Sequence, residues 1–492
     1  MIVLFNPLST TPGKQPLPLS VMSLAAVLEG RHEWTLVDGN VCPTPASEII
    51  GRLGKGSGGP SLVAVSVMPG PQLTQAVDVC RKIRESRPAT PIVWGGYFPT
   101  QHADTVLKSS LVDFVVRSQG ETPLLELIRT LAEGDDPSKV PGLSWKLPNG
   151  EIIHNSIGTM TPLDELPELP YHRVEMEDYI HPTYLGSRTV AHNSSFGCPF
   201  SCSFCAVVAM TNRRWLAESP ERMERVLSRL ARVYRVNAVQ MHDMDFFINE
   251  RRVEEFARRI TPLNLHWWAL GRIDTLMSYS DATWAAMKRS GLTMVFSGAE
   301  SSSDAVLEAM NKGGKASAHL AIDLAKRMRS YGIVPEYSFV LGSPPDPERD
   351  MAQTFEFIRD IKKVNPATEI VLYTYTPVPM EGELFDGAMR LGFAFPKTID
   401  QWATPVWEQF SMRRGDGIPW VDGAVRRRVR NFERVINAFY PTATDPRLTT
   451  VHKAALKAAS AWRYALRWYD APYELRALHR LFRYQRPETT GF

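Results

Sequence analysis

Short apolar runs alternate with amphipathic stretches over about the first 135 residues. Helical periodicity, as in 71–86 and 121–134, fills the intervals between apolar runs at 1–8, 33–40, 61–70, 91–99 and 112–120. Strands that alternate with helices are typical of a doubly wound, Rossmann-like parallel sheet with crossover helices. Gly, Asn, Pro or Ser stands near the end of each run, so the loops at the carboxyl ends of the strands are suited to hold a ligand.

The pattern breaks between about 141 and 187. The segment "LSWKLPNGEIIHN" predicts a hairpin that turns at Asn149-Gly150, and three prolines follow within 162–170. We therefore expect a linker with a hairpin at 141–187, after an N-terminal α/β domain at 1–140.

A second series of apolar runs and helical stretches follows the linker. Its six runs lie at 187–196, 236–246, 265–274, 292–300, 334–342 and 369–377. Six strands separated by helices predict a partial (β/α)6 barrel at 188–395, with chemistry at its carboxyl-end loops. Beyond residue 395 the periodicity is helical and aromatic-rich, so 396–492 is expected to be a basic, mainly helical C-terminal region.

The composition indicates a cellular location and shows that charge is unevenly distributed along the chain. A chain of 492 residues is long enough for two or three domains. Its start, "MIVLFNPL", has neither the basic segment nor the apolar length of a signal peptide, and three of its five cysteines share one loop, so a reducing, cytoplasmic location is expected. The net charge is +3, but 424–492 hold fourteen Lys and Arg against five Asp and Glu. Such a basic end is a solvated helix surface, or it meets phosphates, an acidic redox partner or an anionic membrane surface.

Three cysteines stand close together in "FGCPFSCSFC", at Cys198, Cys202 and Cys205. A structural zinc site needs four ligands, and the two remaining cysteines belong to a different predicted domain, which leaves His192 as a conceivable fourth ligand. Buried, unreactive thiols are a further alternative, although a loop of Gly, Pro and Ser is a poor place for a core. An iron-sulfur cluster fits better, because four irons held by three thiolates leave one iron open to bind something else.

The three cysteines have C-x3-C-x2-C spacing, Phe204 stands before the last of them, and their loop follows the first strand of a six-strand series. This combination resembles the radical S-adenosylmethionine (radical SAM) superfamily. The resemblance implies a [4Fe-4S] cluster on the three cysteines, whose open iron chelates the amino and carboxylate groups of S-adenosylmethionine. One electron from the cluster then cleaves the sulfonium and gives a 5′-deoxyadenosyl radical. A flavodoxin or ferredoxin type protein would supply that electron.

Later strand ends also resemble that family, and each has a plainer alternative. Asp243 and Asp245, in "MHDMDF", stand in the region where the family holds the methionine amino group, or they cap the next helix. Arg272, in "GRID", suits a carboxylate, or it pairs with the aspartate two residues on. Glu300 suits an amino or ribose hydroxyl group, or it is a carboxylate at a helix start. Gly342 matches the fifth strand end of the family, or it makes a turn.

The first domain lacks the marks of a nucleotide site and resembles a different cofactor domain. Neither G-x-G-x-x-G nor a P-loop follows its first strand. Order and spacing resemble the cobalamin-binding domain of one large radical SAM branch. The D-x-H-x-x-G motif is missing, so the resemblance implies cobalamin without a histidine below cobalt, and the alternative is a degenerate domain with no cofactor. The residues assigned to cobalamin by this resemblance are Asp38, Asn40, Ser66, Gly95, Gly96 and Gly120.

Together the resemblances cover about residues 1 to 400 and imply a cobalamin-dependent radical SAM methyltransferase. Such an enzyme moves a methyl group from methylcobalamin to an unactivated carbon after hydrogen abstraction by the 5′-deoxyadenosyl radical. A cobalamin-dependent cyclase or rearrangement enzyme that transfers no methyl group is the first alternative.

A zinc-stabilised binding protein is the second alternative, with tail segments such as "WRYALRWY" stacked on nucleic-acid bases. Helical spacing explains the same aromatic residues as core, so no nucleic-acid partner is expected. The expected substrate is a small molecule, lipid-like or a secondary metabolite, between the barrel mouth and the carboxyl-end loops of the first domain. Peripheral membrane contact by the basic tail is a further expectation.

Overall fold

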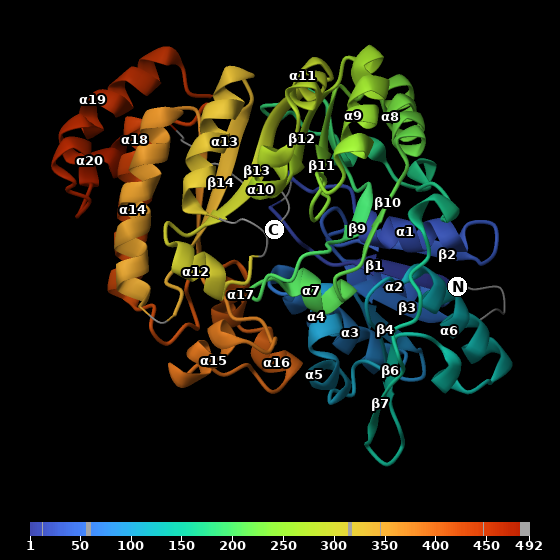
Figure 1. Cartoon of the computed structure of the whole chain (residues 1–492). Coiled ribbons are helices and arrows are strands. Elements are labelled where there is room, and N and C mark those ends of the chain that lie inside the picture. The colour runs from blue at the N-terminus through green and yellow to red at the C-terminus, as the bar shows by residue number, and fades with distance from the viewer. Residues whose placement is uncertain (12, 56–60, 313–316, 345, 446, 483–492) are drawn as a thin grey trace.

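The computed structural model describes residues 1–11, 13–55, 61–312, 317–344, 346–445 and 447–482. Figure 1 shows two α/β units followed by helices, with the N-terminal sheet in blue, the second sheet in green and yellow, and the C-terminal helices in orange and red. The end of the expected C-terminal region, 483–492, lies outside the described residues. Within the described ranges, no helix has both the length and the apolar composition needed to cross a bilayer.

The N-terminal domain is a doubly wound parallel sheet, as the sequence predicts. Its parallel strands are β1 (Ile2–Asn6), β2 (Trp34–Asp38), β3 (Leu62–Ser66), β4 (Ile92–Gly95) and β5 (Phe114–Val116), in the order β2-β1-β3-β4-β5. Its helices are α1 (Leu19–Leu28), α2 (Pro45–Leu53), α3 (Pro71–Ser86), α4 (Tyr97–Gln101), α5 (Ala103–Leu107) and α6 (Glu121–Glu133). Ile2 and Leu4 pack with α1 and α6, whereas Val3 and Phe5 pack with α2 and α3. Alternate side chains of β1 therefore bury opposite faces of the sheet.

The expected hairpin is present, and it extends the first sheet. After the turn η1 (Pro137–Lys139), strand β6 (Leu143–Lys146) pairs antiparallel with β5 and with β7 (Ile152–His154). Trp145 lies opposite Phe114 on the neighbouring strand, and both side chains pack against the core of the first domain. The rest of the linker carries the short turns η2 (Leu163–Glu165), η3 (Tyr171–Arg173) and η4 (Met176–Tyr179).

The second sheet confirms the partial barrel, because each of the six predicted runs contains one of its strands. These strands are β8 (Thr189–His192), β11 (Ala238–Met241), β12 (His266–Leu270), β13 (Leu292–Glu300), β14 (Val334–Leu341) and β15 (Glu369–Thr374). Neighbours in the sheet follow chain order and pair in parallel, with β8 and β15 at the two edges. A separate two-stranded ribbon consists of β9 (Ser195–Gly197) and β10 (Trp215–Ala217).

Helices connect successive strands of the second sheet. They are α7 (Ala206–Thr211), α8 (Pro220–Tyr234), α9 (Glu250–Ile260), η5 (Thr261–Leu263), α10 (Ile273–Ser278), α11 (Asp281–Arg289), α12 (Asp304–Ala309), α13 (Ala318–Ser330) and α14 (Pro347–Val364). The core between sheet and helices is rich in aromatic side chains: the ring of Phe256 lies 5.2 Å from that of Phe246 and 5.3 Å from that of Trp267. Edge-to-face contacts of this kind add to the stabilisation from burial.

The helices that follow β15 divide into two groups, the first of which begins before residue 396, inside the range predicted for the barrel. The first group, α15 (Glu383–Arg390), α16 (Ile399–Trp402) and α17 (Pro405–Ser411), packs on the first domain, where the Trp402 and Phe98 rings lie 5.2 Å apart. The second group, α18 (Gly423–Phe439), α19 (Thr450–Leu466) and α20 (Tyr473–Leu481), extends from α14, where Phe432 stacks on Phe355 at 3.9 Å. Buried aromatic residues in 393–410 explain why part of the region returns to the N-terminal domain.

Candidate active site

The cysteine loop runs from β9 to α7 and carries Cys198, Cys202 and Cys205. Gly197 begins the loop with φ +88°, and a Cβ built there would lie 2.1 Å from the carbonyl oxygen of Arg214. That approach and the left-handed backbone exclude any larger residue. Gly197 therefore sets the sharp turn that starts the loop.

The other side of the loop is tied to the chain that follows β13. Ser203 donates from its backbone N–H to the carbonyl oxygen of Met310 at 2.9 Å and from its hydroxyl to that of Ala309 at 3.1 Å. The amide of Asn311 donates to the carbonyl oxygen of Ser201 at 3.0 Å. A segment more than one hundred residues away in sequence thus fixes the position of the cysteine loop.

The three cysteines of the loop are free thiols. Burial raises the pKa of Cys198 to about 12 and that of Cys202 to about 11. Thiols of this kind stay protonated near pH 7, so a metal that binds them displaces protons. A [4Fe-4S] cluster suits the set, because each thiolate then binds a different iron. Among the described residues, no three His, Cys, Asp or Glu side chains are grouped to hold a single metal ion.

His192, the conceivable fourth zinc ligand, is buried away from solvent at the end of β8. Its Nε2 lies 3.2 Å from the carboxylate of Glu218, and Arg222 donates to the same carboxylate at 3.0 Å. His192 thus takes part in a buried hydrogen-bond network through Nε2, and its Nδ1 is buried with no partner among the described residues.

Arg272 lies beside the cysteine loop and makes three contacts at once. Its Nη1 donates to the sulfur of Cys202 at 3.4 Å, and its guanidinium lies 3.9 Å from the centre of the Phe200 ring. Its Nε and Nη2 donate to the carboxylate of Asp274 at 3.0 and 2.7 Å. Arg272 therefore pairs with Asp274, as the alternative interpretation predicted, and also contacts the cysteine loop. The two are compatible because a guanidinium has five N–H donors.

The two aspartates after β11 have different surroundings. Asp243 accepts hydrogen bonds from the backbone N–H of Ser194 at 3.1 Å and from its hydroxyl at 2.8 Å, one with each oxygen. Asp245 accepts one from the N–H of Phe247 at 3.1 Å, and its Oδ2 is buried without a partner in the described part of the chain. Burial raises the pKa of Asp245 to about 7. Neither aspartate caps the next helix, because the N-cap of α9 is Asn249.

Glu300 ends β13 with φ +64°, a conformation that is uncommon outside glycine. Its carboxylate pairs with the buried ammonium of Lys312 at 2.9 Å, and the Lys312 carbonyl accepts from the Cys202 thiol at 3.8 Å. Sequence reasoning missed Lys312, because no spacing rule joins it to the cysteines. Gly342 makes the turn offered as its plainer alternative, with φ +79°, and its carbonyl oxygen accepts from the indole N–H of Trp420 at 2.9 Å.

In the first domain, Asp38 and Asn40 hold loops together. Asp38 accepts from the Asn6 amide at 3.0 Å, from the Asn40 backbone at 2.9 Å and from the Tyr179 hydroxyl at 2.9 Å. Asn40 accepts from the backbone N–H of Ser9 at 2.9 Å. These bonds tie the loops after β1 and β2 to each other and to the linker, so both residues shape the carboxyl edge of the sheet.

Ser66 and the glycines lie at the same carboxyl edge. The hydroxyl of Ser66, at the end of β3, lies 3.0 Å from that of Ser20 at the start of α1. The pair stands where the strand order reverses between β1 and β3, the place at which open α/β sheets bind ligands. Gly96 precedes α4 with φ +97°, and a Cβ there would lie 3.3 Å from the Ser66 oxygen. Gly95 ends β4, and Gly120 is the residue before α6.

The first domain and the barrel meet at the cysteine loop. Helix α4, which follows Gly96, lies beside α7, which follows Cys205 (Figure 1). Tyr97 of α4 is within electrostatic range of both Cys205 and Arg413. Arg413 follows α17, and its carbonyl oxygen accepts from the N–H of Thr374 at the end of β15. Sequence reasoning missed Tyr97 and Arg413, because only the tertiary fold brings them to this loop.

Two protein-family models match the chain. The one described as "B12 binding domain" matches residues 7–128, and the one described as "Radical SAM superfamily" matches residues 192–358. The first match covers strands β2 to β5 of the N-terminal sheet, and the second covers the cysteine loop and the strand ends with Asp245, Arg272 and Glu300.

Curated relatives and solved structures are similar to most of the chain. An uncharacterized methyltransferase of Pyrococcus horikoshii is 27% identical over 348 residues, covering 70% of this chain and 73% of that protein. An anaerobic magnesium-protoporphyrin IX monomethyl ester cyclase of Synechocystis is 26% identical over 355 residues, covering 71% and 69%. The fold is similar to that of the cobalamin-dependent S-adenosylmethionine radical enzyme OxsB with aqua-cobalamin and S-adenosylmethionine bound. The TM-score is 0.69 at 17% identity, and the match covers 98% of this chain and 75% of that chain. Since both domains are present in the order that this architecture requires, the chain belongs to the cobalamin-dependent radical SAM enzymes.

Proposed function

We propose that this chain is a cobalamin-dependent radical SAM methyltransferase that acts on an unactivated carbon of a small-molecule substrate. The observation that carries the proposal is the contact between α4 of the B12-binding domain and α7 of the radical SAM domain, directly after the cysteine loop. Group transfer between two cofactors and a substrate requires all three to be held close together with water excluded. The junction supports the proposal, because α4 of one cofactor domain lies beside α7 of the other, next to the cysteine loop.

The three thiols of Cys198, Cys202 and Cys205 would hold the cluster. Asp245 would accept from the ammonium of S-adenosylmethionine, because its Oδ2 is buried and has no donor among the residues that the structure describes. Arg272 would bind the carboxylate of the same molecule, since its Nη1 already points to Cys202. When bound, the reduced cluster supplies the electron that cleaves S-adenosylmethionine, and cobalamin carries the methyl group.

The other predicted residues of the barrel would support the cysteine loop. Asp243 would hold the strand that leads to the loop, through Ser194. Glu300 and Lys312 would place the segment that carries Asn311 against the loop, because their buried ion pair fixes the chain after β13. Their side chains use each other as partners.

The carboxyl edge of the first sheet would hold cobalamin. Ser66 and Ser20 present two hydroxyls at the β1/β3 reversal, and Gly96 leaves the space above them open. Gly95 and Gly120 extend the same edge, and Asp38 and Asn40 would keep its loops in place. A histidine below cobalt forms no part of this assignment, because the D-x-H-x-x-G motif is missing from the first loop.

The products of S-adenosylmethionine test this proposal. Reconstituted protein, a low-potential reductant and trideuteromethyl S-adenosylmethionine are incubated with candidate small molecules, and the products are measured by mass spectrometry. A methyltransferase gives S-adenosylhomocysteine together with 5′-deoxyadenosine and a product three deuterons heavier per methyl group. A cyclase or rearrangement enzyme, the candidate favoured by the Synechocystis relative, gives 5′-deoxyadenosine and an unlabelled product.

Two partner expectations stay predictions. A flavodoxin or ferredoxin type protein would deliver the electron near the cysteine loop. Peripheral membrane contact would use the exposed end of α19, where Trp462, Leu466 and Trp468 are 42%, 70% and 51% exposed. Vesicle sedimentation of the wild type against a Trp462→Ser/Trp468→Ser variant checks the second expectation, which fails if both bind equally or neither binds.

A further inference from the structure

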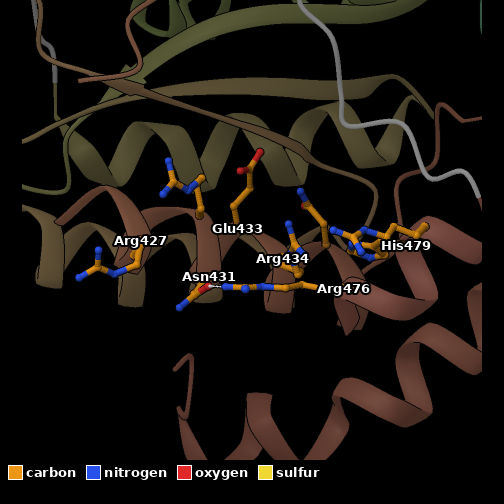
Figure 2. A pocket seen from close by; sticks show the side chains of 9 residues that line it. Arg427, Asn431, Glu433, Arg434, Arg476 and His479 are labelled. Carbon is orange, nitrogen blue, oxygen red and sulfur yellow. Dashed lines mark hydrogen bonds between the residues drawn. The ribbon is translucent and has the colours of Figure 1, made fainter. Parts of the chain in front are cut away.

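A cavity of about 530 Å³ opens between α18 and α20, away from the cysteine loop. Six of its lining residues come from α18 and three from α20. Its volume lies in the range of small-molecule sites, roughly 300 to 1,000 Å³. Figure 2 shows side chains from both helices turned toward this space.

The lining of the cavity is strongly cationic. It holds five arginines against a single carboxylate, that of Glu433. Like charges that share a concave surface repel one another and raise the local potential for anions. The five arginines are Arg427, Arg430, Arg434, Arg476 and Arg480.

The arrangement follows from helical spacing. Arg427, Arg430 and Arg434 stand at positions i, i+3 and i+7 of α18, so they share one face of that helix. Arg476 and Arg480 stand four residues apart on the facing side of α20. An amphipathic surface helix needs only scattered charges for solvation, whereas here both helices turn cationic positions toward each other.

The cavity is held in a fixed shape. Arg476 donates to the side-chain oxygen of Asn431 at 3.2 Å, which bridges the two helices (Figure 2). Below α18, the stacked rings of Phe432 and Phe355 fix that helix to α14. Asn431 itself is buried, so the bridge forms part of the cavity floor.

Two further observations indicate that the cavity binds a ligand. Within the described ranges, Arg430 and Arg480 take part in no ion pair. Asn437 lines the same cavity, is 2% exposed, and has a side-chain oxygen with no hydrogen-bond partner among the described residues. A buried acceptor without a partner is destabilising unless a donor group of a ligand, or a water, satisfies it.

We propose that this cavity binds a phosphate-bearing anion with at least two negative charges, such as a pyrophosphate group. The guanidinium fork matches two oxygens of one phosphate, and several forks suit a ligand with several such oxygens. Exposed Arg427, Arg430 and Arg480 receive the charge of the phosphate at the rim, and the Asn437 oxygen accepts from a hydroxyl or N–H group of the ligand, or from a water beside the phosphate. The site is independent of the proposed methyl transfer, because none of its residues lies at the cysteine loop.

Isothermal titration calorimetry of the full chain with sodium pyrophosphate, without divalent metal and at low salt, tests the proposal. One saturable site is expected, with affinity that falls as salt rises. Arg430→Gln/Arg480→Gln should weaken binding at least tenfold, whereas Arg430→Lys/Arg480→Lys should retain part of it. The control is Arg251→Gln/Arg258→Gln, which removes two charges from the exposed face of α9 and should leave the affinity within twofold.

A second arm identifies the source of the phosphate. Sedimentation with phosphatidylcholine vesicles that contain phosphatidic acid, against phosphatidylcholine alone, measures binding to a lipid headgroup. The wild type could bind phosphatidic acid vesicles but give no heat with pyrophosphate. If Arg430→Gln/Arg480→Gln then loses the vesicle binding, the site takes a lipid phosphate, and this result still supports the proposal. Absence of saturable binding in both arms, or equal binding by the glutamine variant and the wild type, overturns the proposal. Circular dichroism melting of each variant confirms that it folds.

Discussion

Replacing Arg272 separates the two roles that the structure gives to this side chain. Arg272→Gln removes the paired hydrogen bonds to Asp274 and the contact with Cys202 at 3.4 Å. The side chains of Arg272 and Asp274 are 9% and 15% exposed, so water replaces little of what is lost. If pairing with Asp274 were the whole role, neutralising both members of the pair would leave S-adenosylmethionine binding intact.

The magnitude follows from the burial of the pair. Removing one partner of a buried ion pair costs about 3–5 kcal/mol, because the other charge stays buried without compensation. Arg272→Gln alone should therefore lower the free energy of unfolding by about 3 kcal/mol or more. In Arg272→Gln/Asp274→Asn no unpaired charge remains, and we expect at least half of that loss to return.

Stability is measured by urea unfolding, and S-adenosylmethionine affinity by equilibrium dialysis with the cluster-loaded protein. We expect the affinity to fall at least tenfold in both Arg272 variants, including the one whose stability recovers. Asp274→Asn is the matched control and should bind within about threefold of the wild type. If Arg272→Gln/Asp274→Asn binds S-adenosylmethionine as the wild type does, Arg272 is only a structural partner of Asp274.

Three further predictions concern the site and its support. Asp243→Ala leaves Ser194 without its acceptor and should lower the free energy of unfolding by about 2–4 kcal/mol, while S-adenosylmethionine still binds. Asp245→Asn should weaken S-adenosylmethionine binding at least tenfold without that loss of stability. Equal effects of the two changes in dialysis and urea unfolding would refute the division. Gly96→Ala puts a side chain on a backbone conformation (φ +97°, ψ −161°) that is almost restricted to glycine and crowds the Ser66 hydroxyl, so this variant should lose corrin in an optical count. Gly30→Ala, whose Cβ would meet nothing within 4 Å, is the control and should keep its corrin. Burial in the barrel raises the pKa of Glu336 from its ordinary 4.5 to about 8, so the folded state holds a proton that the unfolded state releases, and stability is lost as pH rises between these values. Between pH 6 and 8 the wild type should lose about 2 kcal/mol more than Glu336→Gln in urea unfolding, and parallel pH profiles would contradict this.

The strands could be predicted from sequence because each buries a short apolar run. Ile2 to Phe5 alternate between the two faces of one sheet, and 292–300 carry the buried strand β13. The hairpin at Asn149-Gly150 was also readable, because that dipeptide favours a tight turn. The pairing of this hairpin with β5 could not be predicted, because a local pattern does not indicate which strand a hairpin will join.

The site was predictable where a motif carries it and not where packing does. The cysteine spacing indicated its chemistry, and Arg272 followed from its position after a strand. Asp243 and Asp245 looked equivalent in sequence, and only their partners distinguish them. Tyr97 and Arg413 could not be predicted, because they are far apart in sequence and only the tertiary fold brings both within electrostatic range of Cys205.

The division of the C-terminal region has the same origin. The sequence shows helical periodicity through 396–492, but it does not say which helix packs on which domain. Trp402 packs on the first domain and Phe432 on α14, and both choices depend on surfaces formed elsewhere in the chain. The arginine cavity between α18 and α20 likewise exists only once both helices are placed.

A cofactor count after anaerobic reconstitution with iron, sulfide and hydroxocobalamin decides whether one chain holds both cofactors. The account predicts about four irons per chain and one tightly held corrin, by the stoichiometry of a [4Fe-4S] cluster and one B12-binding domain. Cys198→Ala/Cys202→Ala/Cys205→Ala should lose the iron and keep the corrin, and Cys42→Ala, outside the loop, should keep both. A wild type that holds zinc in place of iron, or a triple variant that keeps its cluster, would contradict the account.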